Sequence, residues 1–199
     1  MPILSSYGCR VLQARALLVL ALLLMGLATD VGWAATSGFG PAFNQAVSAY
    51  NAGQLDEADR HLRVALRQLT GVPLPYKAAA RLMFGRVKNH QQLPELAEEY
   101  CSAALADYKT LHGNTPHMDL AGAYLCLAEA AALQQAWPAA VKQNESALRL
   151  YQQLDPTNAA IEGIAHNSEV FRQRAADPGD AQMPVAPETP LSEPADALP

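Results

Sequence analysis

Apolar residues recur along the middle of the chain at the three- and four-residue spacing of helices. One stripe consists of Leu62, Ala65, Leu66 and Leu69, and the same spacing returns between positions 120 and 131. Side chains at this spacing share one side of a helix, so each stripe is expected to face a core. Alanine and leucine are abundant while β-branched residues are sparse, which favours helices over strands. The pattern therefore predicts an all-α protein.

Small residues repeat over a longer period, near forty residues. Three columns of alanine or glycine keep offsets of 39 and 43 residues. The columns are Ala46, Gly85 and Ala128; Ala58, Ala97 and Ala140; and Ala65, Ala104 and Ala147. Two helices approach closely only where the side chains at their crossing are small. A period of this length indicates stacked helical hairpins, each too small to bury its apolar face alone.

The first unit contains the clearest turn. Gly53 ends its first helix, because glycine tolerates the left-handed backbone that such a stop requires. The segment 49–58 (AYNAGQLDEA) resembles a tetratricopeptide repeat. Ala46 matches the small position of that family's first helix, and Ala58 and Ala65 match the two small positions of its second helix.

The other units match the family unequally. The third repeats these features and stops at Pro156, since proline cannot continue a helix. In the second, Pro94 stands where the family usually has an aromatic residue and Cys101 replaces a large apolar one. We therefore expect an irregular turn between its two helices. The loop 112–117 (HGNTPH) resembles the connection of the longer, kinesin-light-chain-like variety of the repeat.

The resemblance implies the domain organisation. Residues 36–175 are expected to form a short helical-repeat solenoid of about three antiparallel helix pairs, closed by a C-terminal capping helix over 158–174. Residues 176–199 contain six prolines and few bulky apolar side chains. Such a segment cannot offset its ordering entropy by burial, so we expect a disordered, proline-rich acidic tail.

The first 35 residues have the order of a secretory signal peptide. Arg10 and Arg15 precede an apolar run over 16–28, and a stretch of small residues follows. Thirteen helical residues rise about 20 Å, less than the roughly 30 Å of a bilayer core. We expect cleavage near Ala34 and a periplasmic or secreted protein. The alternative is a chain anchored in the membrane by a retained N-terminal segment.

Two cysteines, Cys101 and Cys126, would remain after cleavage. An oxidising compartment permits a disulfide between them, but sequence spacing does not decide whether one forms. The interpretation preferred from sequence is a pair of small buried apolar side chains.

Net charge restricts the classes of partner. The formal charge is −5, and residues 177–199 hold five acidic residues and no Lys or Arg. The remaining chain is nearly neutral and has no basic stripe, so we expect no nucleic-acid binding. It also has no phosphate-binding loop, no HExxH motif and no GxSxG motif. We therefore expect no enzymatic activity and no cofactor.

Two clusters of polar residues contain side chains of the kinds used in metal binding and acid–base catalysis. His112 and His117 share a loop, but the sequence places no third ligand beside them, so no metal site is predicted. Glu95, Glu98 and Glu99 are expected to form a solvated helix face, because paired carboxylates need burial to divide acid and base roles.

The family resemblance implies a binding role. Ligands of tetratricopeptide repeats usually lie along a concave face built from the first helix of each pair. The residues that match this face are Phe43, Val47, Tyr50, Asn51, Leu82, Arg86, Asn89, His90, Leu125 and Glu129. The resemblance thus implies a non-catalytic module that binds an unidentified protein or peptide.

Two other functions are compatible with the sequence. The chain would be a structural or assembly protein if its repeat ends, which leave apolar surface, pair with one another. It would be a hydrolase if the scattered histidines and glutamates formed a site, although no motif supports this.

Overall fold

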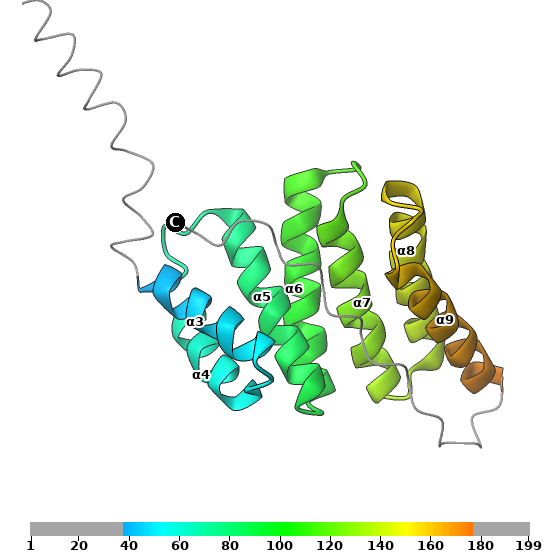
Figure 1. Cartoon of the computed structure of the whole chain (residues 1–199), viewed down its shortest axis with the longest axis horizontal. Helices are drawn as coiled ribbons and strands as arrows, with labels where there is room; N and C mark the ends of the chain where they lie inside the picture. Colours follow the sequence, from blue (N-terminus) through cyan, green and yellow to red (C-terminus); the bar gives the residue numbers. More distant parts are fainter. Residues whose placement is uncertain (1–37, 177–199) are drawn as a thin grey trace, which may run out of the picture. The chain divides into compact units, whose positions relative to one another are not determined.

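The computed structural model of the protein describes residues 38–176, which contain seven helices and no strand (Figure 1). The helices are α3 (Phe39–Asn51), α4 (Leu55–Leu66), α5 (Leu74–His90), α6 (Pro94–His112), α7 (Met118–Leu133), α8 (Trp137–Leu154) and α9 (Ala160–Ala176). The all-α prediction is confirmed for this part of the chain. The expected signal peptide lies outside the described residues, and so does the expected tail apart from Ala176, which ends α9.

The helices pack in the order in which they occur in the sequence (Figure 1). The most extensive contacts join α3 to α4, α5 to α6 and α7 to α8. The contact between α4 and α5 is the least extensive of those between consecutive helices. α5 also contacts α7, so helices two apart in the sequence touch as well. This neighbour-to-neighbour packing is consistent with a helical repeat.

All nine residues of the three small-residue columns are buried. The prediction that these columns face other helices is therefore confirmed. Gly85 shows why a small residue is needed, because a Cβ atom there would lie 2.3 Å from Cys101 Sγ and 3.2 Å from the Ala97 carbonyl oxygen. Only glycine lets α5 approach α6 this closely.

Three turns share one backbone conformation. Gly53, Gln92 and Gln135 all adopt left-handed φ angles, of 71°, 59° and 59°. The residue after each donates its backbone N–H to the carbonyl oxygen five residues earlier, at 2.8 to 2.9 Å. This is the Schellman arrangement that ends helices. The three positions are separated by the same 39 and 43 residues as the small-residue columns.

The turn of the second unit is therefore regular, and the expected irregularity was wrong. Pro94 is the first residue of α6, where a backbone N–H would have no partner within the helix. The ring of proline also has a φ angle suited to that position. Pro94 thus starts the helix without disturbing the turn at Gln92.

Glutamine in a left-handed turn should cost stability that glycine would recover. We expect Gln92→Gly and Gln135→Gly each to raise the free energy of unfolding by about 0.5–1 kcal/mol, because a side chain is disfavoured at this φ. Urea denaturation of each variant would measure the change. Gln92→Ala is the matched control, since it keeps a Cβ atom at the left-handed position and should bring no gain. An equal gain from alanine and glycine would contradict the explanation.

The last helix covers α8. Val170 and Phe171 of α9 are buried in one apolar cluster with Ala140, and Trp137 packs against this cluster. The helix starts two residues later than expected, because the Asn158 side chain accepts a hydrogen bond from the backbone N–H of Ala160 at 2.9 Å. Asn158 is therefore a turn residue before the helix. The outward side of α9 is polar and exposed, and includes Glu162, His166, Glu169 and Arg172.

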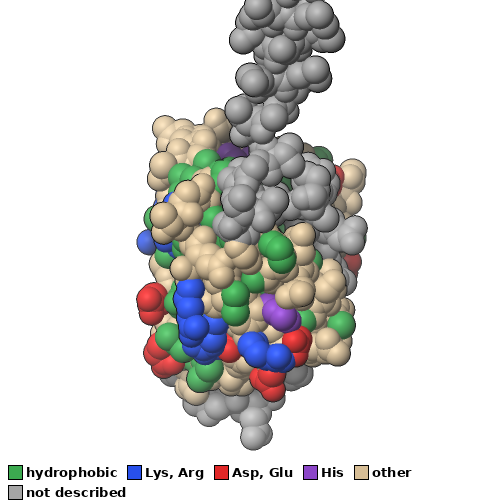
Figure 2. All heavy atoms as spheres, turned by 90° about the vertical axis from the view of Figure 1, so that its left-hand side faces the viewer, with side chains coloured by type: hydrophobic (Ala, Val, Ile, Leu, Met, Phe, Trp, Pro, Cys, Tyr) green, Lys and Arg blue, Asp and Glu red, His purple; other side chains and the backbone are tan. Residues whose placement is uncertain are grey.

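At the other end, charges of both signs lie side by side. Figure 2 shows the side of the molecule on which α3 and α4 lie, where Lys and Arg side chains are next to Asp and Glu side chains. On α4, Arg63 pairs with Asp59 at 2.8 Å and Arg60 pairs with Glu57. Among the described helices, none is long and apolar enough to cross a lipid bilayer.

Candidate binding surfaces

The first helices of the expected pairs are α3, α5 and α7, and they hold all ten residues expected to line a groove. On α3, Val47 and Tyr50 are half-buried and Asn51 is exposed. The Tyr50 hydroxyl lies 3.1 Å from Nε2 of His90, an exposed residue on α5. This contact joins α3 to α5 at the surface.

A buried polar group joins α5 to α7. The Asn89 side chain is fully buried, and its amide donates to the Cys126 carbonyl oxygen at 2.9 Å and to Glu129 Oε2 at 3.0 Å. Arg86 is also buried, and its guanidinium donates to the Gly122 carbonyl oxygen at 3.5 Å. Arg86 Nε and Asn89 Oδ1 have no hydrogen-bond partner among the described residues. These side chains fix the position of α7 against α5.

Burial divides the ten expected groove residues into two groups. Phe43, Leu82, Arg86 and Asn89 are buried; the last three belong to α5, which is packed against α4, α6 and α7. Phe43 stacks on Phe39 of the same helix at a centroid distance of 5.6 Å. The six residues that reach the surface are Val47, Tyr50, Asn51, His90, Leu125 and Glu129. We call these six the α3–α5–α7 surface.

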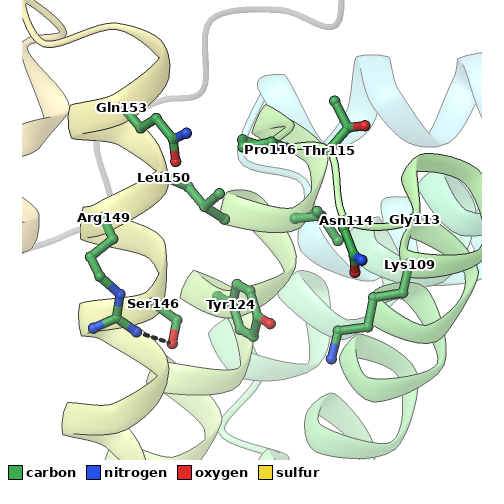
Figure 3. A pocket seen from close by; sticks show the side chains of 11 residues that line it. Lys109, Gly113, Asn114, Thr115, Pro116, Tyr124, Ser146, Arg149, Leu150 and Gln153 are labelled. Atoms are coloured by element: carbon green, nitrogen blue, oxygen red, sulfur yellow. Dashed lines mark hydrogen bonds between the residues drawn. The ribbon is translucent and has the colours of Figure 1, made fainter.

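A separate open pocket of about 540 Å³ lies beside the loop 113–116 (Figure 3). Its charged lining residues are Lys109 on α6 and Arg149 on α8, and no acidic residue lines it. The Lys109 ammonium lies 5.7 Å from the centroid of the Tyr124 ring, and the Arg149 guanidinium donates to Ser146 Oγ at 3.1 Å. Two cations at an open pocket suit an anionic group. No sequence motif indicated this pocket.

The structure supplies the third residue that the sequence did not place beside the two loop histidines. Asp119 Oδ2 lies 2.9 Å from His112 Nε2 and 3.1 Å from His117 Nδ1. The His112 ring also stacks near Tyr108, at a centroid distance of 6.1 Å. Burial, together with the Asp119 charge, raises the pKa of the Tyr108 hydroxyl above its ordinary value.

A buried ion pair joins α4 to α5. The Lys88 side chain is only 2% exposed and pairs with Asp59, while its ammonium also donates to Gln91 Oε1 at 2.8 Å. Burial raises the pKa of the Asp59 carboxyl, but hydrogen bonds from Lys88 and Arg63 outweigh burial and hold this pKa below its usual value. Asp59 is therefore ionised at neutral pH and balances the buried ammonium.

Cys101 and Cys126 form a disulfide between α6 and α7. Their Cα atoms are 6.0 Å apart, within the usual range for disulfides, and both residues are fully buried. The preferred interpretation of two unlinked apolar side chains was wrong, because the packing of α6 against α7 brings the two cysteines together.

The acidic run on α6 is a solvated face, as predicted. Glu95, Glu98 and Glu99 are all exposed, and Glu98 accepts a hydrogen bond from Gln134 at 2.9 Å. Exposure keeps such carboxylates in water, where their ordinary hydration is retained.

Comparison with known proteins leaves the chain without an assigned family. No family model, characterised protein or solved structure matches it. The tetratricopeptide assignment thus stays a prediction from the sequence pattern.

Proposed function

We propose that the protein is a non-catalytic tetratricopeptide-type module that binds a peptide or protein segment on its α3–α5–α7 surface. The observation that carries this proposal is the coincidence of two repeats. The left-handed turns at positions 53, 92 and 135 keep the offsets of the buried small-residue columns. Backbone and side chains thus support the same unit, a helical hairpin, repeated as α3–α4, α5–α6 and α7–α8. In this proposal α9 is the cap of a short solenoid.

The chemistry of the surface fits a polypeptide ligand. Tyr50 and Leu125 offer apolar contact area, while Asn51, His90 and Glu129 offer hydrogen-bonding groups. Tyrosine is enriched among residues that dominate binding energy. Beneath this surface, Asn89 bonds to α7 and Arg86 lies buried, so the helices that carry the contact residues are held in place. A rigid surface loses less conformational entropy on binding.

Crosslinking in cells, followed by mass spectrometry, would identify the partner. We include export in the proposal, so envelope and secreted fractions are the material to use. N-terminal sequencing of the mature chain would test cleavage near Ala34. Recovery of the chain crosslinked only to itself would instead support the assembly function, and light scattering of the purified protein would then measure its oligomeric state.

With the partner in hand, surface variants test the site. The double variant Tyr50→Ala/His90→Ala should weaken binding by about 2 kcal/mol or more, roughly thirtyfold, because an aromatic contact residue is lost. Arg60→Ala, at an exposed position on α4, is the matched control and should bind normally. Isothermal titration calorimetry would measure both. The proposal is wrong if the double variant binds like the parent, or if only Arg60→Ala loses affinity.

A further inference from the structure

Three potential metal ligands meet where α6 ends and α7 begins. His112 is the last residue of α6, His117 is the N-cap of α7, and Asp119 lies in the first turn of α7. Their ligand atoms all lie within 4.8 Å of one another. Ligands about 2.0–2.1 Å from a tetrahedral ion are roughly 3.3 Å apart. The two distances from Asp119 Oδ2, 2.9 Å to His112 Nε2 and 3.1 Å to His117 Nδ1, are close to this value.

One nitrogen of this cluster has neighbours with opposite requirements. The backbone N–H of Asp119 donates to His117 Nδ1 at 3.2 Å, which requires a lone pair on that nitrogen. The Asp119 carboxylate, 3.1 Å from the same atom, requires a proton on it. An imidazole nitrogen carries either a lone pair or a proton, so one of the two contacts is unfavourable. A cation between the nitrogen and the carboxylate would take a lone pair from each, so that no proton is needed on Nδ1, and the Asp119 N–H would give up its contact with that nitrogen.

We propose that His112, His117 and Asp119 bind a divalent transition-metal ion, with Zn²⁺ as the best match. Two imidazoles suit zinc and its neighbours in the first transition row, whereas Mg²⁺ and Ca²⁺ prefer oxygen ligands alone. Three protein ligands leave a fourth position of a zinc tetrahedron to water. The side chains of His112, His117 and Asp119 are 20%, 46% and 41% exposed, so an ion reaches the site from solvent.

Binding requires a small rearrangement of the rings. The two imidazoles are stacked, with centroids 3.7 Å apart and planes 9° from parallel. Their lone pairs must converge to bind one ion, so one ring has to turn. His117 is the more exposed of the two and turns toward the ion, while His112 stays in place against Tyr108.

The ion would fix the loop between its ligands. Residues 113–116 connect His112 to His117 and form one wall of the pocket in Figure 3. Metal binding joins the end of α6 to the start of α7 and thereby holds this wall. The site is separate from the α3–α5–α7 surface, so it does not depend on the proposed function.

Titration of the full-length, untagged chain with ZnCl₂ tests the proposal. The titration uses a chain that carries Cys9→Ser, so that the Cys9 thiol cannot compete for Zn²⁺. Isothermal titration calorimetry should find one Zn²⁺ bound per chain. The affinity for Zn²⁺ should fall about tenfold or more in each of His112→Gln, His117→Gln and Asp119→Asn, since each removes a ligand. Mg²⁺ and Ca²⁺ should not bind at the same concentrations. Asp119→Glu, which keeps a carboxylate, should retain more affinity than Asp119→Asn.

The controls separate this site from adventitious binding. His166→Gln changes an exposed histidine on α9 and should leave Zn²⁺ affinity unaltered. In the chain with all three ligands intact, Zn²⁺ should shift the amide NMR signals of residues 112–119 more than others. The proposal is overturned if the ligand variants bind like their parent, if His166→Gln abolishes binding, or if the shifted signals lie elsewhere.

Discussion

Asp59→Ala is expected to lower the free energy of unfolding by about 3–5 kcal/mol. The change removes the acidic partner of Lys88, whose side chain is only 2% exposed. Gln91 Oε1 at 2.8 Å and the Phe84 ring, with its centroid 4.7 Å away, would remain beside the ammonium. Neither carries a negative charge, so the buried cation stays uncompensated. Urea denaturation at pH 7 would measure the loss.

A double variant shows whether the loss comes from the unpaired charge. Lys88→Met removes the ammonium and keeps an apolar side chain of similar length, so Asp59→Ala/Lys88→Met should recover most of the stability. Asp56→Ala is the matched control on the same helix, because Asp56 is exposed, and it should cost less than about 1 kcal/mol. A double variant no more stable than Asp59→Ala would contradict this explanation.

The same ion pair predicts how stability depends on pH. The pKa of Asp59 is lower in the folded chain than in the unfolded chain, where it is about 3.9. The unfolded state therefore binds the proton more readily, and the stabilisation is present above about pH 4 and is lost as pH falls through the lower, folded pKa. Denaturation midpoints between pH 6 and pH 3 should fall less in Asp59→Asn/Lys88→Met than in the parent chain.

Loss of the disulfide should destabilise the protein by an amount similar to that expected for Asp59→Ala. We expect Cys101→Ala/Cys126→Ala to lower the free energy of unfolding by about 3 kcal/mol. The bridge closes a loop between residues 25 positions apart and so restricts the unfolded chain. Denaturation with and without dithiothreitol would measure the contribution in the parent chain.

The double alanine variant is also the control for the reductant. Dithiothreitol should leave its stability unchanged, because no bridge remains to be reduced. A thiol assay on the denatured, unreduced Cys9→Ser chain should detect no free thiol. Two free thiols, together with a parent stability that dithiothreitol does not alter, would contradict the prediction.

The sequence predicted the helical class and the buried columns because both depend on local spacing. Ala58, Ala97 and Ala140 fall on the core face of α4, α6 and α8 whatever the details of helix crossing. The turns at Gln92 and Gln135 were missed, since neither residue is typical of a left-handed backbone. The offsets of 39 and 43 residues, counted from Gly53, would have located both.

The candidate sites were less predictable because they depend on how helices meet. Arg86 and Asn89 were expected to face outward, yet both are buried, since the contact between α5 and α7 covers them. Asp119 was not connected to the two histidines, because the sequence does not show that the loop 113–116 returns the chain onto itself. Its position two residues after His117 was the available signal.

The disulfide also determines how the protein would respond to mechanical force. A chain pulled from its two ends lengthens by unravelling helices, but the 25-residue interval between Cys101 and Cys126 is bypassed by the covalent bridge. At about 3.3–3.6 Å per extended residue, and with 6.0 Å still spanned by the bridge, the oxidised chain is roughly 75–85 Å shorter at full extension than the reduced one. Oxidation thus keeps residues 101–126 from lengthening, while the outer parts of α6 and α7 and the helices on either side still yield to tension.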